Sequence, residues 1–221
     1  MSYIAFLTEY GSQYLNGALV TVIQFVAAAL IAVVIAHLFG LLSLSPSLIL
    51  RGFATIYIEF FRGTSLLVQL FWLFYVLPLF GVPLDKAWTG FIAVGLNLGA
   101  YGAQLVRTAI LSTPRGQWEA AYALSMSPYK RMVRIILPQA IVTMLPAWGN
   151  LMVELLKSTA LVALIAVPDI MFSSKQINNT TYLSTWAFGT ALAMYYILAR
   201  FMVTPLSRRF ETIMAKRMGR K

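Results

Sequence analysis

The sequence contains no cysteine and few charged residues. Because Cys is absent from all 221 residues, the chain has no disulfide framework, thiolate metal site or cysteine nucleophile. Charged residues make up 11% of the chain, whereas a soluble domain carries roughly a quarter. Together with 60% hydrophobic residues and a mean hydropathy of +0.77, this shortage of charge predicts a polytopic membrane protein.

The sequence is equally poor in motifs for catalysis. His37 is the single histidine, and the sequence has neither an HExxH motif nor an Asp-rich metal set. Ser65, in the tripeptide GTS, and His37 have no supporting hydrolase motif, so we expect His37 to be a packed or interfacial residue. We therefore predict no metal site and no catalytic residue in this chain.

Five stretches approach or exceed the roughly 20 apolar residues that a spanning helix needs. The sequence predicts an all-α fold in which a single domain, residues 1–221, contains about five transmembrane helices. The predicted spans are 16–42, 53–80, 88–111, 138–167 and 185–206.

The distribution of Lys and Arg predicts the orientation of these spans. With the N-terminus outside, the outer segments hold only Lys86 and Lys175. The inner segments hold Arg51, then Arg115, Lys130, Arg131 and Arg134, then Arg208, Arg209, Lys216, Arg217, Arg220 and Lys221. The apolar run 18–42 is too long for the core of a signal peptide, so we expect a retained first span. The basic C-terminus is then cytoplasmic and faces anionic lipids, which explains the net charge of +10 without nucleic-acid binding.

Residues 112–137 form a cytoplasmic segment between the third and fourth spans. Pro114 suits the start of a helix over 115–125. Ser127 suits an N-cap and Pro128 the first position of a second, amphipathic helix over 129–137. The segment thus predicts two short helices at an angle beneath the membrane.

The first of these helices has the features of a contact surface. Trp118 and Tyr122 lie one turn apart, and large aromatic residues dominate many protein interfaces. Ala120 and Ala121 leave the helix thin enough for close approach by a partner. The residues alone also fit an ordinary amphipathic loop at the membrane surface.

Four stretches resemble one family of membrane proteins. "GQWEAAYALSMSPYKRMVRIILPQA" (116–140) resembles the EAA loop of binding-protein-dependent ABC importer permeases. "YIEFFRGTSLLVQLFWLFYVLP" (57–78), "GAYGAQLVRTAILSTPRGQWEAA" (99–121) and "LLKSTALVALIAVPDI" (155–170) resemble the polar amino acid (His/Glu/Gln/Arg/opine) permeases of that class. The resemblance runs in order from about residue 11 to about residue 210.

The resemblance implies a type I ABC importer transmembrane fold with a cytoplasmic EAA-type coupling helix. It implies a complex with a second permease subunit (identical or paralogous), two ATPase subunits and an extracytoplasmic solute-binding protein in the bacterial inner membrane. This chain has no G-x-x-x-x-G-K-[ST] loop, so ATP and Mg²⁺ are expected on the partner ATPase. The resemblance assigns ATPase coupling to Gly116, Trp118, Glu119, Ala120, Ala121, Tyr122 and Ser125.

Polar residues within the spans are candidates for the substrate path. They are Asn97, Gln104, Asn150, Glu154 and Ser158. Two further pairs have the spacing to meet on one helix face, Glu59 with Arg62 and Glu154 with Lys157. Each of these residues could instead lock helices together through polar contacts.

Two departures from the family pattern bear on the substrate. Members often have Glu at the position of Gln104 and Asp at that of Ser158. Without those acids we expect a net-neutral zwitterion, either an amino acid or an ectoine-like compatible solute, in preference to arginine or lysine. The alternative function is a membrane-anchored assembly or signalling subunit that docks an ATPase without transporting.

Overall fold

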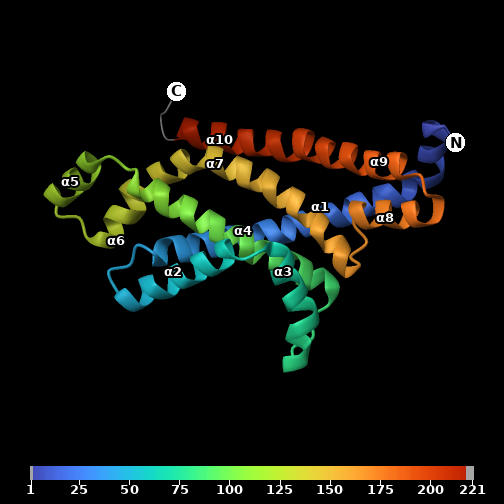
Figure 1. Cartoon of the computed structure of the whole chain (residues 1–221). Coiled ribbons are helices and arrows are strands. Elements are labelled where there is room, and N and C mark those ends of the chain that lie inside the picture. Colours follow the sequence, from blue (N-terminus) through green and yellow to red (C-terminus); the bar gives the residue numbers. More distant parts are fainter. Residues whose placement is uncertain (1, 218–221) are drawn as a thin grey trace.

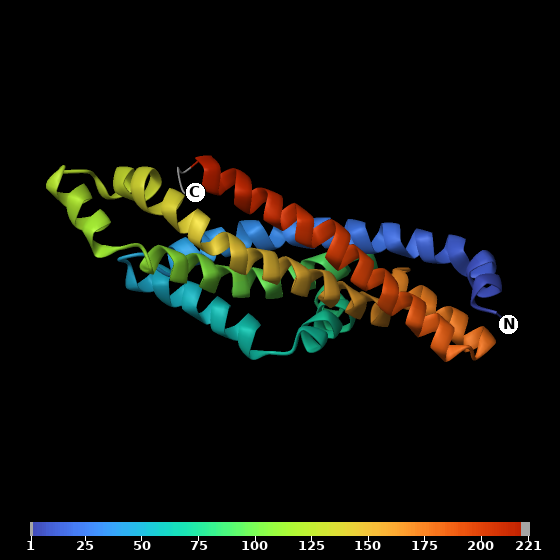
Figure 2. The ribbon, with the colours of Figure 1, turned by 90° about the horizontal axis from the view of Figure 1, so that it is seen from above.

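A computed structural model describes residues 2–217 of the chain, and every regular element in it is helical. Long helices lie side by side along one axis, with α5 and α6 at one end and the N-terminus and α8 at the other (Figures 1 and 2). The elements are α1 (Tyr3–Leu42), α2 (Leu48–Gly63), α3 (Leu66–Phe71), η1 (Trp72–Val76), η2 (Leu77–Phe80), α4 (Lys86–Leu111), α5 (Arg115–Ala123), α6 (Pro128–Arg131), η3 (Met132–Ile136), α7 (Leu137–Ser158), η4 (Thr159–Ile165), α8 (Ile170–Thr181), α9 (Ser184–Ile197), η5 (Leu198–Val203) and α10 (Thr204–Arg217). In this described part of the chain, four helices are long and apolar enough to cross a membrane, or five if one bent pair is counted as a span.

Helix α1 packs against α4 more extensively than any other two elements pack. Glycines on α4 permit this close approach, because a Cβ atom at Gly95 or Gly99 would lie 2.7 Å from a side-chain atom of Ile31 or Ile35. Small residues at such spacings let helix backbones approach closely in membranes, where apolar burial gives little drive for association. The α1–α4 pair forms the centre on which the other helices pack.

The helix that contains the first predicted span, 16–42, extends well beyond it toward the N-terminus. Helix α1 starts at Tyr3 and has 40 residues, so it is about 60 Å long against a hydrocarbon layer of about 30 Å. Its first turns are stabilised by burial, since Phe6 and Tyr14 are 0% and 2% exposed against α8 and α9. A hydropathy window misses this extension because polar residues separate these aromatic side chains.

The second predicted span, 53–80, is not one straight helix. It begins earlier, at Leu48, and α2 meets the helical segment Leu66–Phe80 at an angle of 102°. The chain is extended at Thr64 (φ −117°, ψ 153°) and at Ser65 (φ −69°, ψ 129°), directly after Gly63. The segment α3–η2 consequently projects sideways from the other helices (Figure 1).

The fourth and fifth predicted spans also differ in extent from the structure. A continuous helical rod, here called the fourth rod, runs from Pro128 to Ile165. The short helix expected over 129–137 and the span expected over 138–167 therefore belong to one element. The π-helical turn η3 precedes Pro138, and such a wider turn accommodates the missing N–H of proline. The fifth span, predicted at 185–206, likewise continues through η5 and α10 to Arg217.

A buried carboxylate joins three elements at the end of the molecule that holds α8. Asp169 is 0% exposed; its Oδ1 accepts the Phe172 amide at 2.7 Å and its Oδ2 accepts the Tyr195 hydroxyl at 2.9 Å. The Ile170 amide donates to Thr21 Oγ1 at 3.2 Å. These bonds attach the start of α8 to both α1 and α9.

Candidate coupling segment and substrate pocket

Helix α5 ends in a Schellman cap that sets the corner of the coupling segment, which is residues 112–137. The Met126 amide donates to Ala121 O at 3.1 Å, and the Ser125 amide donates to Tyr122 O at 2.8 Å. Ser125 has a φ of 52°, in the left-handed region where glycine is usual. The sequence therefore forms this corner with a serine in a conformation that costs about 1 kcal/mol or more.

The second half of the corner agrees with the sequence prediction. The Ser127 side chain accepts the Lys130 amide at 3.4 Å, and Pro128 occupies the first turn of α6. Helix α6 then continues into η3 and α7 without a break. The predicted N-cap is confirmed, but the helix it begins is the long fourth rod.

Arg131 links the two halves of the coupling segment. Its guanidinium carbon lies 3.9 Å from the ring centroid of Tyr122 and 5.7 Å from that of Trp118, and the residue is 9% exposed. Gln139 Nε2 also donates to Gln117 Oε1 at 3.2 Å. A cation over an aromatic face contributes about 0.5–2 kcal/mol, depending on its burial. Sequence reasoning treated Arg131 only as one of several basic residues.

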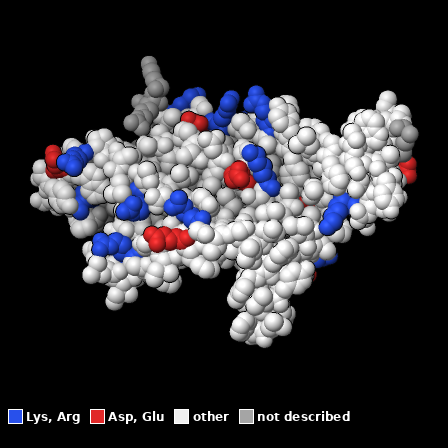
Figure 3. Space-filling model, in the orientation of Figure 1, with Lys and Arg blue, Asp and Glu red and all other residues white. Residues whose placement is uncertain are grey.

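The predicted coupling residues differ in exposure. Ala121 is buried and Trp118 is half-buried, so neither is a free contact. Gly116, Glu119, Ala120, Tyr122 and Ser125 are exposed. Tyr122 is 61% exposed, although its ring also lies against the Arg131 guanidinium. Figure 3 shows basic side chains over the end that holds α5 and α6 and along α10, further charged side chains of both signs over α2 and α7, and a mostly uncharged surface elsewhere on that face.

A pocket of about 400 Å³, here called the polar pocket after the charged and amide side chains among its lining residues, lies between α2, α4 and α7. It brings together four residues predicted from three separate parts of the sequence, namely Arg62, Gln104, Asn150 and Glu154. The Arg62 guanidinium carbon is 5.3 Å from the ring centroid of Tyr101, which also lines the pocket. The lining thus contains a cationic residue and an acidic residue on different helices, together with two residues that carry neutral amides.

The amino-acid sequence of the chain is similar to those of known transport proteins. The family model described as "Binding-protein-dependent transport system inner membrane component" matches residues 28–212. The chain belongs to this family. It is 42% identical over 190 residues to a probable amino-acid ABC transporter permease protein, y4tF, of Sinorhizobium fredii, covering 83% of this chain and 80% of that protein. It is 34% identical over 200 residues to the L-cystine transport system permease protein TcyB of Bacillus subtilis, covering 89% and 84%.

Solved structures agree with the assignment. The permease is similar to a chain in the crystal structure of an amino acid ABC transporter with histidines, at a TM-score of 0.88 and 30% identity, covering 96% of this chain and 98% of that one. A chain of the MetNI methionine ABC transporter, at a TM-score of 0.81 and 16% identity, shares the fold and covers 93% and 98%. The predicted type I ABC importer fold is confirmed, and the permease is a multi-pass protein of an inner-membrane family.

Several predicted polar residues of the permease lie outside the pocket. Asn97 is 5% exposed and donates to Phe61 O at 2.8 Å and to Gln69 Oε1 at 3.1 Å, so it holds helices together. Ser158 is half-buried and does not line the pocket, and Glu59 is exposed.

Only one of the two predicted intramembrane charge pairs is present. Within residues 2–217 the only ion pair is Glu154 with Lys157, at 3.8 Å between exposed side chains, so the predicted Glu59–Arg62 pair is absent there. The Arg62 guanidinium lies over the Tyr101 ring instead.

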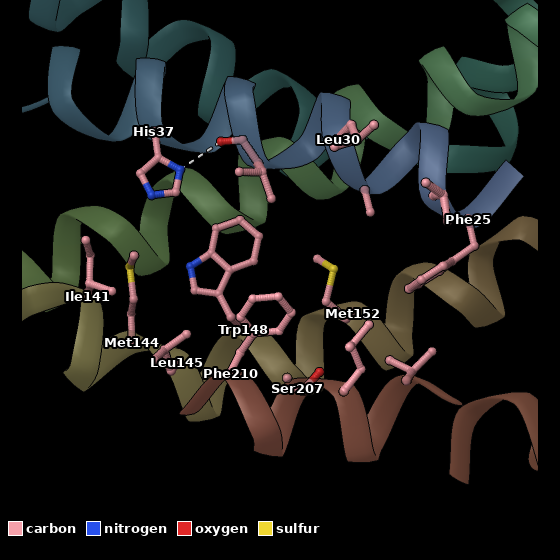
Figure 4. Close-up of a pocket in the computed structure, with 16 residues that line it drawn as sticks. Phe25, Leu30, His37, Ile141, Met144, Leu145, Trp148, Met152, Ser207 and Phe210 are labelled. Carbon is pink, nitrogen blue, oxygen red and sulfur yellow. Dashed lines mark hydrogen bonds between the residues drawn. The ribbon is translucent and has the colours of Figure 1, made fainter. Parts of the chain in front are cut away.

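A second cavity of about 500 Å³ lies on the other face of α7 (Figure 4). Its walls come from α1, α7 and the η5–α10 helix, and Phe25, Trp148, Met152 and Phe210 make it strongly apolar. His37 lines it as a packed residue, its Nδ1 2.8 Å from Val33 O and its ring stacked on Trp148 at 5.9 Å. A site for a polar solute needs placed polar groups, so the pocket at Arg62 and Glu154 is the better candidate for a substrate site.

Proposed function

We propose that this permease forms part of the membrane path of an ATP-driven importer for amino acids or related small zwitterions. The observation that supports this most directly is the polar pocket, where Arg62 and Glu154 face one solute-sized volume. A carboxylate of the solute would bind Arg62, and an ammonium group would bind Glu154. Gln104 and Asn150 add neutral hydrogen-bonding groups, which favours a net-neutral solute over arginine or lysine.

Energy would enter through the coupling segment at the cytoplasmic end. In this proposal the exposed face of α5, with Glu119 and Tyr122, docks into an ATPase subunit that binds ATP and Mg²⁺. The Lys/Arg distribution supports a topology with the N-terminus outside and the C-terminus in the cytoplasm. Of the basic tail residues, Arg220 and Lys221 lie outside the described residues, and the side chain of Arg217 is also not described.

The remaining subunits would complete the path. A second permease, identical or paralogous, would supply the opposite wall of the translocation path, because the pocket is open on one side in a single chain. Two ATPases and an extracytoplasmic solute-binding protein would complete the importer. The description of the family, as an inner membrane component of binding-protein-dependent transport systems, and the type I fold support this assembly in general terms.

Reconstitution tests the proposal. The permease, its ATPase and its binding protein are placed in proteoliposomes, and uptake of labelled solute is measured together with ATP hydrolysis. We expect ATP-dependent uptake that saturates with neutral amino acids or compatible solutes and is weak for arginine. An ATPase that docks but ignores loaded binding protein, with no uptake, would support the assembly or signalling function instead.

Glu119→Lys tests the site of coupling within the same assay. The reversed charge lies on the exposed face of α5 and away from the pocket, so we expect normal membrane insertion with uptake at least tenfold lower, as for loss of a hydrogen bond to a charged group. Uptake at the wild-type rate would show that α5 does not dock the ATPase through this face.

A further inference from the structure

Helix α5 packs mainly against one other element, the π-helical turn η3. At the last residue of α6, directly before η3, the side chain of Arg131 is 9% exposed and lies beneath Tyr122 and beside Trp118, and Trp118 also packs against the apolar cluster that includes Ile136 of η3. The Gln117–Gln139 hydrogen bond is a second link between α5 and the fourth rod. On the other side, α5 is joined to α4 through the short connection 112–114.

These contacts connect α5 to the helical rod that forms part of the pocket wall, so that a movement of α5 can reach the pocket. Arg131 lies in the first turn of a helical rod that runs without interruption from Pro128 to Ile165 and carries Asn150 and Glu154 of the polar pocket. We propose that Arg131 is a positioning residue: it clasps α5 to this rod, so that displacement of α5 moves the pocket wall formed by α7. The proposal rests on the proposed docking of α5 on an ATPase.

The chemistry of arginine suits this role. The guanidinium is planar and permanently charged, so it stacks on a ring over a wide contact, whereas the compact lysine ammonium does not. Within residues 2–217 no carboxylate lies within 4.0 Å of Arg131. The two aromatic rings therefore provide the main compensation for its burial, and the clasp depends on the rings and the cation together.

The neighbouring basic residue Arg134 offers a matched control. It lies on the same rod three residues later and is exposed, and within residues 2–217 its guanidinium lies over no aromatic ring. Arg131→Met keeps an unbranched apolar side chain but removes the cation. Arg131→Lys keeps the charge but removes the planar face. Tyr122→Leu removes the ring from the other side of the contact and serves as a second route to the same loss.

Spin labels can report the clasp directly, because the chain has no cysteine of its own. Labels at Ala123→Cys on α5 and Thr143→Cys on α7 are both at exposed positions. In the assembled transporter we expect a narrow distance distribution for the wild type and for Arg134→Met. We expect a broader one for Arg131→Met, Arg131→Lys and Tyr122→Leu.

The second measurement is solute imported per ATP hydrolysed by the same complexes. We expect a fall of about two- to fivefold in the three clasp variants, the factor expected for loss of one cation–ring contact, and no fall in Arg134→Met. An unchanged distance distribution in Arg131→Met overturns the clasp. A broadened distribution with unchanged uptake per ATP overturns its role in coupling. If the wild-type complex imports nothing, the proposed function fails, while the label distances still report on the clasp.

Discussion

Asn97 donates a hydrogen bond to Gln69 over 3.1 Å, and this bond holds α4 against the bend that separates α2 from α3. Gln69 in turn donates to Thr64 Oγ1 at 2.6 Å, at the point where the chain turns. Asn97 also donates to Phe61 O at 2.8 Å. The two side-chain amides therefore satisfy polar groups that the 102° bend leaves without helical partners.

Replacing Asn97 by Leu tests this structural role. The change removes both donated bonds and leaves the buried Gln69 Oε1 without a donor, whereas Phe61 O keeps its bond from Gln69 Nε2. An unsatisfied buried acceptor costs about 1–3 kcal/mol. We expect a lower midpoint of thermal unfolding, measured by size-exclusion chromatography after heating, with little change in the KM for solute. Asn150→Ala, in the pocket, should show the reverse pattern. A raised KM without a stability loss in Asn97→Leu would instead place Asn97 in the substrate path.

Glu154→Gln tests the substrate pocket. Loss of the carboxylate removes the proposed partner of the solute ammonium, and a hydrogen bond to a charged group contributes about 1.5–3 kcal/mol. We expect the KM for uptake to rise about ten- to a hundredfold. Lys157→Gln is the control, because Lys157 pairs with Glu154 at 3.8 Å but does not line the pocket. Equal effects of the two variants would show that the ion pair, and not solute binding, requires Glu154.

The helical class and the approximate spans could be predicted because apolar composition over about 20 residues is a local signal. The bend at Thr64 could not, since a hydropathy window averages over the extended residues. The N-terminal extension of α1 depends on burial of Phe6 and Tyr14 against α8, which is a contact between distant parts of the chain. Gln69, a lone amide in an apolar run, was a signal for the missed network.

The candidate site was predicted unevenly for the same reason. Ser127 and Pro128 act within one turn, so their capping role can be predicted from adjacent residues alone. The pocket residues were identified as polar groups in apolar spans, which does not distinguish a pocket residue such as Asn150 from a packed one such as Asn97. Arg131 lies in a basic stretch, and nothing local distinguishes it from its solvated neighbours.

Gly99→Ala tests the close approach of α1 and α4. An added Cβ would lie 2.7 Å from Ile35 Cγ2 and 2.9 Å from Ile35 Cβ, and such overpacking costs typically 1–3 kcal/mol. We expect a lower unfolding midpoint in detergent. Gly189→Ala in α9 is the matched control, because no atom lies within 4 Å of its added Cβ and helix propensity alone favours Ala by up to about 1 kcal/mol. Equal stability of the two variants would contradict the tight packing.

Ser125→Gly tests the strained corner after α5. Glycine adopts the left-handed conformation of residue 125 (φ 52°) without the steric cost of a Cβ, so we expect the corner to gain about 0.5–1 kcal/mol. Hydrogen exchange of the Met126 amide, which donates to Ala121 O, should slow by about two- to fivefold. Ser127→Ala removes the neighbouring cap and should speed exchange in the first turn of α6. Faster exchange at Met126 in Ser125→Gly would contradict the strain.

The buried carboxylate of Asp169 predicts how stability depends on pH. Asp169 lies between the fourth rod and α8, and burial raises its pKa from 3.8 to about 6, against the lowering effect of its bonds from the Phe172 amide and the Tyr195 hydroxyl. A raised carboxyl pKa means that the folded state binds its proton more tightly than the unfolded state does. This contribution to stability is therefore fully present below about pH 4 and is lost as the pH rises through about 6.

Asp169→Asn isolates this contribution. Asparagine remains neutral at every pH and can still accept the Phe172 amide, so the variant should lose the part of the stability change between pH 4 and pH 6 that belongs to Asp169, roughly 2–3 kcal/mol. The measurement is the unfolding midpoint of wild type and variant across this range in the same detergent. The difference between variant and wild type should grow in favour of the variant as the pH rises, because only the wild type must then hold a buried charge. Parallel pH profiles for the two proteins would show that Asp169 keeps the same pKa in the folded and unfolded chains.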